Sequence, residues 1–139
     1  MNIYFAGSIR GVSPDKSLFL RLINHCTNHG HVLTEHSFDY RYEDEIKVDD
    51  EWIYQTDMGW LRKANAVVAE VTWPSLGVGY EIAKAEEWGK PLLLLHREGS
   101  DRRLSAMLSG NKGLMIKSYG DPEEACSAID EFIASLKTG

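Results

Sequence analysis

The sequence predicts an α/β fold with a doubly wound, five-stranded parallel sheet covered by helices on both faces. Short apolar runs alternate with stretches of helical periodicity along all 139 residues. The apolar runs lack a clean two-residue alternation, which is typical of strands buried on both faces. No internal repeat or low-complexity linker divides the chain, so residues 1–139 are expected to form one flavodoxin-like or Rossmann-like domain.

Each expected element follows from a local pattern. Helices are favoured where apolar residues recur every three or four positions, as they do at Leu18, Leu22 and Cys26, and Gly30 is a plausible stop for that first helix. The strands are expected at Asn2–Ala6, His31–Thr34, Ala66–Val71, Pro91–His96 and Leu114–Lys117, and the helices at Asp15–His29, Glu51–Ala64, Val78–Trp88, Leu104–Leu108 and Pro122–Leu136. The acidic stretch Phe38–Asp50 is expected to be a loop.

Composition excludes several classes of protein. With 43% hydrophobic residues, 26% charged residues and a net charge of -6, the chain has the composition of a globular domain and lacks the basic stripe that binds nucleic-acid polymers. No apolar run approaches the roughly 20 residues that span a bilayer, and no secretory signal is evident, so we expect a cytoplasmic or nuclear protein without a membrane partner. Cys26 and Cys126 lack metal-ligand spacing and are interpreted as reduced structural thiols.

Two glycine-containing loops follow the first and third predicted strands, where doubly wound folds bind ligands. Ser8-Ile9-Arg10-Gly11 offers a hydroxyl, backbone N–H groups and a guanidinium, and Pro74-Ser75-Leu76-Gly77 offers the same backbone groups at a helix N-terminus. Together they could hold one phosphate. Neither is a dinucleotide or triphosphate motif, and two sharp turns that need glycine for backbone reasons would give the same pattern.

Three ionisable residues occupy positions where the periodicity calls for apolar ones. Asp57 falls on the apolar stripe of its helix, Glu81 falls on that of the next helix, and Tyr4 lies in the first strand. Each has a structural explanation: Asp57 could accept hydrogen bonds from a neighbour, Glu81 could reach solvent, and Tyr4 could be a core aromatic with a satisfied hydroxyl. Two such carboxylates near a glycine-containing turn are the stronger indication of a site, because an unpaired buried carboxylate is costly.

Several separated segments, in order, resemble one enzyme family. YFAGSIRG, TEH at residues 34–36, DMGWLRKANAVVAEVTWPSLGVGYE and LSAM at residues 104–107 resemble the 2'-deoxynucleoside 5'-phosphate N-hydrolases, relatives of the nucleoside 2-deoxyribosyltransferases. The resemblance implies hydrolysis of the N-glycosidic bond of a deoxynucleoside 5'-monophosphate, a small-molecule substrate, to free base and 2-deoxyribose 5-phosphate. It implies a homodimer, and no metal or organic cofactor.

The resemblance also implies roles for individual residues. Glu81 would be the nucleophile that forms a glycosyl-enzyme intermediate, Asp57 would assist the leaving base, and Tyr4 would orient the catalytic carboxylate. The implied substrate-binding residues are Ser8, Ile9, Arg10, Gly11, His36, Ser75 and Gly77, with Ser105 and Met107 supplied by the neighbouring subunit. Two alternatives stay open: a nucleoside 2-deoxyribosyltransferase that passes the sugar to a second base, and a non-catalytic nucleotide-binding module. The residues do not indicate which base leaves.

Overall fold

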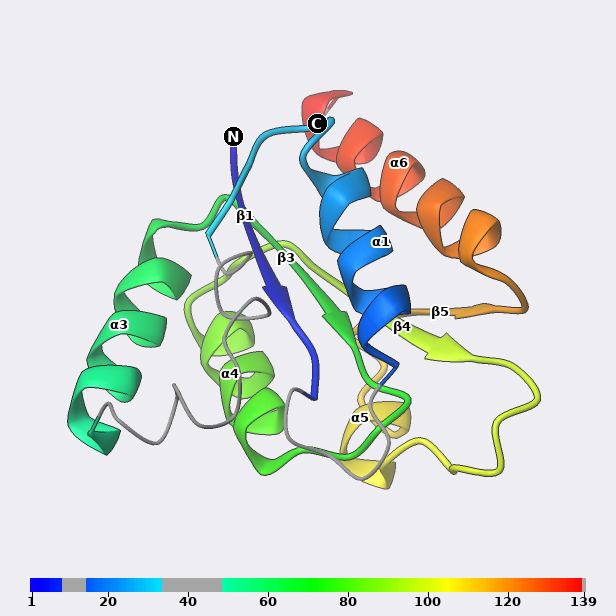
Figure 1. Ribbon diagram of the computed structural model, residues 1–139, viewed down its shortest axis with the longest axis horizontal. Helices are drawn as coiled ribbons and strands as arrows, with labels where there is room; N and C mark the ends of the chain where they lie inside the picture. The colour runs from blue at the N-terminus through cyan, green and yellow to red at the C-terminus, as the bar shows by residue number, and fades with distance from the viewer. Residues whose placement is uncertain (9–14, 34–48, 139) are drawn as a thin grey trace.

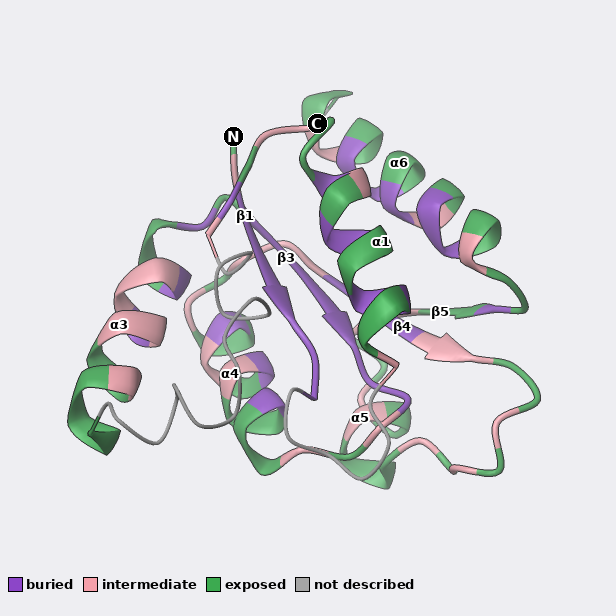
Figure 2. Ribbon diagram, in the orientation of Figure 1, coloured by how far each residue is buried: buried purple, intermediate pink, exposed green. Residues whose placement is uncertain are grey.

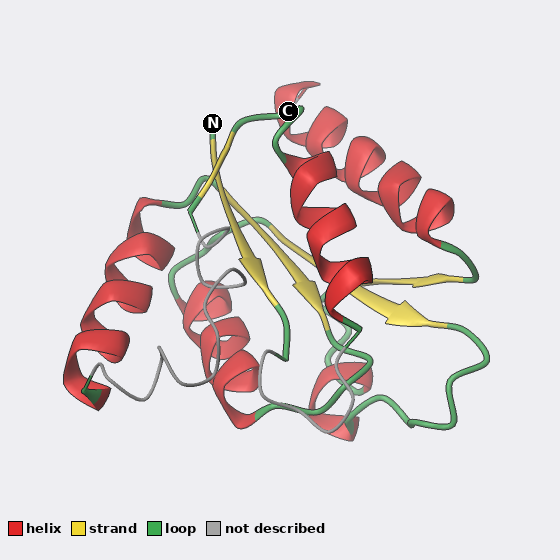
Figure 3. Ribbon diagram, in the orientation of Figure 1, coloured by secondary structure: helices red, strands yellow, loops and turns green. Residues whose placement is uncertain are grey.

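The computed structural model describes residues 1–8, 15–33 and 49–138, which form a sheet between two layers of helices (Figure 1). The strands are β1 (Asn2–Ala6), β2 (His31–Val32), β3 (Ala66–Glu70), β4 (Leu92–Arg97) and β5 (Met115–Tyr119). The helices are α1 (Lys16–Cys26), α3 (Asp50–Lys63), α4 (Leu76–Glu87), α5 (Ala106–Ser109) and α6 (Pro122–Thr138). Strands and helices alternate along the described chain, as predicted (Figure 3).

The sheet is parallel throughout and has the strand order β2-β1-β3-β4-β5. The chain therefore runs from β1 to its neighbour β2 on one side and returns to β3 on the other side. Strand order reverses between β1 and β3, and ligands of doubly wound folds bind at the carboxyl ends of the strands on either side of such a point. The predicted fold class is confirmed, and the chain leaves β1 and β3 at this position.

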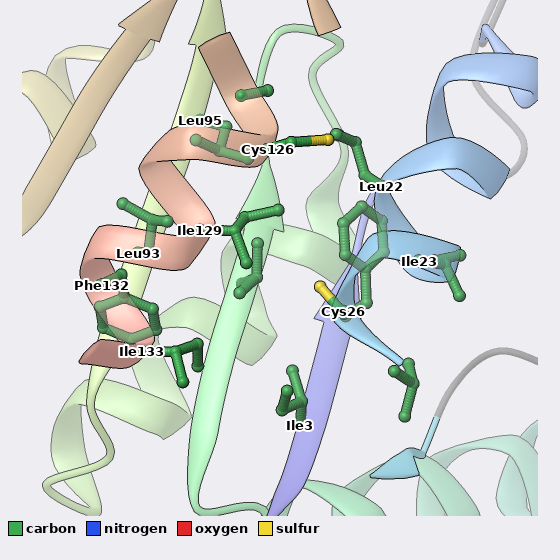
Figure 4. Close-up of a cluster of buried hydrophobic side chains, with 14 of the residues drawn as sticks. Ile3, Leu22, Ile23, Cys26, Leu93, Leu95, Cys126, Ile129, Phe132 and Ile133 are labelled. Atoms are coloured by element: carbon green, nitrogen blue, oxygen red, sulfur yellow. The ribbon is translucent and has the colours of Figure 1, made fainter. Parts of the chain in front are cut away.

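The two faces of the sheet carry separate apolar clusters. Ile3 and Phe5 face the layer of α1 and α6, whereas Tyr4 and Ala6 face the layer of α3 and α4. Every residue of β3, the central strand, is buried (Figure 2). Figure 4 shows the first cluster, in which side chains of α1 and α6 pack over the sheet. This alternation directs Tyr4 toward the same layer that contains Asp57 and Glu81.

Side-chain caps fix where three helices begin. Asp15, Asp49 and Ser75 each accept a hydrogen bond from a backbone N–H in the first turn of α1, α3 and α4. Because Asp49 is the cap, Asp50 belongs to α3, and the prediction that the loop extends through Asp50 is wrong by one residue. The rest of the predicted loop lies in residues 34–48, outside the described part of the chain, apart from Asp49 itself.

Other boundaries differ from the predictions by a few residues. The first predicted helix ends at Cys26 rather than His29, because the chain turns there to place Gly30 against Met1. A Cβ on Gly30 would lie 2.2 Å from the carbonyl oxygen of Met1, so glycine is required by this close approach. The second strand ends at Val32, and β5 continues to the buried Tyr119, which pairs with Arg97 of β4.

The two cysteines are unpaired and buried in the cluster beneath α1 and α6 (Figure 4). Their positions agree with the prediction of structural thiols. None of the helices in the described ranges has the length and apolar character needed to cross a membrane.

Candidate active site

Tyr4 and Glu81 form a direct hydrogen bond on the α3/α4 side of the sheet, with the tyrosine hydroxyl donating to Glu81 Oε2. Tyr4 is almost completely buried in β1, and Glu81 is half-buried in the second turn of α4. Burial is the main reason that the pKa of Tyr4 is raised, and the nearby charges of Glu81 and Asp57 raise it further. Tyr4 therefore remains protonated and keeps donating to the carboxylate.

The Glu81 carboxyl is a weaker acid than an exposed glutamate. Burial raises its pKa from an ordinary 4.5 to about 7, against the hydrogen bond from Tyr4, which lowers this pKa. The negative charge of Asp57 adds to the increase. A carboxylate with a pKa this high binds a proton or a carbon electrophile more readily than an exposed one, which is the property that a nucleophile in a glycosidic site needs.

Asp57 reaches the same place from α3. Asp57 is half-buried, as are Ile53 and Trp60 on the same side of the helix. The fully buried residues of α3 are Met58 and Leu61. The charge of Asp57 acts on both Tyr4 and Glu81, so the three predicted groups lie together although they come from three separate elements. On α4, Val78, Ile82 and Ala85 are buried around Glu81 as the apolar stripe predicts.

Replacing Tyr4 with phenylalanine tests the tyrosine–carboxylate contact. The substitution removes a donor that favours the ionised form of Glu81, so the pKa of Glu81 should increase above about 7. A hydrogen bond to a charged group corresponds to about one to two pH units. We expect the acid limb of the pH profile of kcat/KM to move to higher pH by about that amount. An unchanged limb would contradict this contact.

The N-terminus of α4 lies about one and a half turns before Glu81 and offers free backbone N–H donors. Ser75 Oγ accepts from the N–H of Val78 at 3.2 Å, and the Ser75 carbonyl accepts from the N–H of Gly79 at 3.1 Å. Within the described chain, no group accepts a hydrogen bond from the N–H of Leu76 or Gly77. Two N–H groups at the positive end of a helix dipole form a favourable place for an anion.

The start of the loop after β1 and the loop that leads to α4 both contact the ring of Phe19. A Cβ on Gly7 would lie 3.3 Å from Phe19 of α1, and Trp73 of the loop after β3 packs edge-on against the same Phe19 with ring centroids 5.5 Å apart. Ser8 is buried at the end of the described part of this loop. The predicted ligand-binding residues Ile9, Arg10 and Gly11, and also His36, lie outside the described residues.

Glu70 is a supporting residue that the sequence reasoning missed. It is completely buried at the end of β3, where it accepts hydrogen bonds from the N–H and the hydroxyl of Thr72 at 2.5 and 2.9 Å and from the hydroxyl of Tyr119. The Thr72 hydroxyl in turn accepts from the N–H of Arg97 at 2.9 Å. These bonds tie the ends of β3, β4 and β5 together and fix the start of the loop that carries Ser75. Burial raises the pKa of Glu70, and the hydrogen bonds oppose that increase.

Ser105 and Met107 are surface residues at the start of α5. Ser105 caps this short helix by accepting from the N–H of Met107 at 3.2 Å, and the Met107 side chain is 83% exposed. Leu104 and Leu108 pack inward against the α3/α4 cluster, which directs Met107 outward. These positions leave Ser105 and Met107 accessible to another molecule.

This arrangement defines a class of protein: a doubly wound α/β domain that places a carboxylate pair near a helix N-terminus with free backbone N–H groups at the carboxyl edge of its sheet. The sequence model of the nucleoside 2-deoxyribosyltransferase family matches residues 3–125, and the chain belongs to this family.

Individual relatives and one solved structure show which proteins of known name the chain is similar to. The chain is 48% identical over 144 aligned positions to the 5-hydroxymethyl-dUMP N-hydrolase of Mus musculus, covering 99% of this chain and 83% of the relative. It is 38% identical to the 5-hydroxymethyl-dUMP N-hydrolase of Danio rerio, covering 98% of both chains. Its fold is similar to that of the CMP N-glycosidase BcmB of Clostridium botulinum, with a TM-score of 0.68, 17% identity, and coverage of 95% of this chain and 99% of that one. By their names, all three proteins cleave N-glycosidic bonds of nucleotides.

Proposed function

We propose that this enzyme hydrolyses the N-glycosidic bond of 2'-deoxynucleoside 5'-monophosphates, giving the free base and 2-deoxyribose 5-phosphate. The observation that carries this proposal is the Glu81 carboxylate, held by Tyr4 and repelled by Asp57, one and a half turns from the N-terminus of α4. The axial distance from Leu76 to Glu81 is about 7.5 Å at 1.5 Å per residue. A deoxyribose 5-phosphate extends over a comparable length from its phosphate to its anomeric carbon.

The first step forms a covalent intermediate. The reactive form of the pair carries one proton, because the two nearby carboxyl groups disfavour ionising together. With this proton on Asp57 and Glu81 ionised, Glu81 attacks C1', the C1'–N bond breaks with its electron pair going to the base, and Asp57 gives its proton to the base. The sugar passes through a cation-like state, which forms more easily without a 2'-hydroxyl. Tyr4 holds the carboxylate in position throughout, since its hydroxyl is a fixed donor.

The second step returns the enzyme to its starting state. Water adds to C1', its proton goes to Asp57, and the bond between C1' and the Glu81 oxygen breaks, releasing 2-deoxyribose 5-phosphate. Both steps use the same two carboxyl groups in alternating roles. The buried position of Glu81 favours the neutral ester over the charged carboxylate, which assists the first step.

The phosphate site gives a separate prediction. Arg10→Ala removes the guanidinium expected to pair with the 5'-phosphate, and we expect KM for the monophosphate to rise at least about tenfold. KM for the unphosphorylated nucleoside should change much less. Arg21→Ala is the matched control, because Arg21 pairs with Glu123 on the other side of the sheet. Equal effects on both substrates would remove Arg10 from the phosphate site.

A substrate panel separates this function from the alternatives. A deoxynucleoside and its 5'-monophosphate are each incubated with and without an acceptor base, and release of free base is measured. The proposed hydrolase releases base from the monophosphate without an acceptor, whereas a transferase requires the acceptor and a binding module releases none. Because the relatives are named for 5-hydroxymethyl-dUMP, this nucleotide heads the panel, followed by the other pyrimidine and purine deoxynucleotides and their ribonucleotide counterparts.

We further propose that the enzyme works as a homodimer in which Ser105 and Met107 complete the neighbouring site. The large exposure of Met107 and of Leu76, which is 97% exposed at the start of α4, supports an apolar contact between subunits. Sedimentation should show a dimer, and Ser105→Ala should weaken monophosphate binding. A monomer with unchanged affinity in that variant would contradict the shared site.

A further inference from the structure

Three side chains with metal-ligand chemistry converge where α1 packs against α6. His25 Nε2 and His29 Nε2 lie 2.7 and 2.6 Å from the same atom, Asp130 Oδ1. All three potential ligand atoms lie within 4.8 Å of one another. The imidazoles are sheltered, with side-chain exposures of 24% and 20%, and Asp130 opens to solvent at 50%.

The ion-pair partners of Asp130 in the described parts of the chain are the two histidines. Within these same ranges, no lysine or arginine forms an ion pair with Asp130, and between these helices Arg21 pairs with Glu123 instead. A carboxylate and two imidazoles without a competing basic side chain are a ligand set for a transition-metal dication.

We propose that His25, His29 and Asp130 bind Zn²⁺ or a similar transition-metal dication. Zinc binds imidazole nitrogen and carboxylate oxygen at about 2.0–2.2 Å, so tetrahedral ligand atoms are separated by roughly 3.4 Å. The two imidazoles must therefore move away from Asp130 Oδ1 by less than about 1 Å. On binding, each ring coordinates as a neutral imidazole through the Nε2 lone pair with its single N–H proton on Nδ1, and water occupies the fourth position.

The position of this cluster separates it from the catalytic chemistry. His29 lies just before β2, at the amino edge of the sheet, whereas the N-terminus of α4 lies at the carboxyl edge. The metal would join the C-terminal end of α1 to the middle of α6 (Figure 1). Its effect is therefore on stability, and glycosidic bond cleavage does not depend on it.

Thermal unfolding of tag-free, metal-stripped protein tests the site with Zn²⁺ itself. At zinc concentrations about 100-fold above Kd, linkage predicts a rise in Tm of about 8 °C. His29→Ala and Asp130→Asn should each lose most of this shift, with Kd for zinc weakened at least roughly tenfold in calorimetry. His31→Ala is the matched control, because His31 is an exposed histidine two residues away and should keep the full shift. Mg²⁺ should give no shift, since it prefers oxygen ligands.

Two results would overturn the proposal. The first is a zinc-induced shift of the same size in His29→Ala and in the unsubstituted chain. The second is the absence of any saturable binding of one zinc per chain, with Tm of the variants lowered equally with and without zinc. Base release from the monophosphate, measured in the same samples, should not change with zinc, so the outcome is independent of the proposed function.

Discussion

Glu81→Gln is expected to lower the rate of base release by at least about 10⁴-fold, as the loss of a covalent nucleophile does in other enzymes. Glutamine retains the shape of the side chain and can still accept the hydrogen bond from Tyr4, so the fold should not change. The variant should still bind the monophosphate, because the backbone N–H groups that we propose hold the phosphate at the N-terminus of α4 are untouched.

The same substitution should stabilise the protein at alkaline pH. Because the pKa of Glu81 is about 7 in the folded chain against an ordinary 4.5, the folded chain binds more protons than the unfolded chain between these pH values. The free energy of unfolding therefore decreases as pH rises through this window. At about pH 8 the ionised carboxylate costs the folded state at most about 3 kcal/mol, and Glu81→Gln removes this cost.

Urea unfolding at several pH values measures this effect. The gain from Glu81→Gln should be largest above about pH 7 and should disappear toward pH 4.5. Glu87→Gln, on the same helix but exposed, is the control and should alter neither activity nor the pH dependence of stability. A variant with normal turnover would remove Glu81 from the nucleophile role.

Asp57→Asn is expected to lower kcat by about 10²- to 10⁴-fold, the range that a general acid contributes. Asparagine cannot deliver a proton to the leaving base, so the loss should be smallest for bases that leave readily as anions. The substitution also removes a charge that raises the pKa of Glu81. The acid limb of the pH profile should therefore move to lower pH, opposite to the shift expected for Tyr4→Phe.

The opposite shifts of these two variants distinguish electrostatic roles from a general loss of structure. Glu51→Gln, an exposed carboxylate in the first turn of the same helix, is the matched control for Asp57. If Asp57→Asn lowered kcat equally for all bases and left the acid limb in place, Asp57 would have no part in proton transfer.

The fold was predictable because the strands are buried on both sides. Apolar runs such as residues 66–69 have few alternatives to a central parallel strand, and the caps and glycines near helix ends restrict where each helix begins and stops. The end of α1 was predicted three residues too late, because Gly30 is a plausible helix stop by sequence although the apolar stripe ends at Cys26. A tertiary contact between Gly30 and Met1, which no local pattern encodes, ends the helix there.

The proximity of Tyr4, Asp57 and Glu81 was predictable from ionisable residues at positions where the pattern calls for apolar ones. Asp57 and Glu81 interrupt apolar stripes, and the structure brings both to Tyr4. Glu70 lies in a strand rather than on an amphipathic helix, so the interrupted helical stripe did not single it out. Its partners Thr72 and Tyr119 come from the following loop and from β5, so its role follows from the three-dimensional contacts alone. A charged residue inside a run that is otherwise wholly apolar is the signal that could have identified it.

Trapping the covalent intermediate tests the central claim most directly. The enzyme is quenched by acid during turnover of a deoxynucleoside monophosphate, digested, and examined by mass spectrometry for a peptide that carries 2-deoxyribose 5-phosphate. The predicted result is a single adduct on Glu81 that forms before water attacks and is absent from Glu81→Gln. An adduct on another residue, or steady turnover in which the sugar is never attached to the protein, would contradict the assignment of Glu81 as the nucleophile.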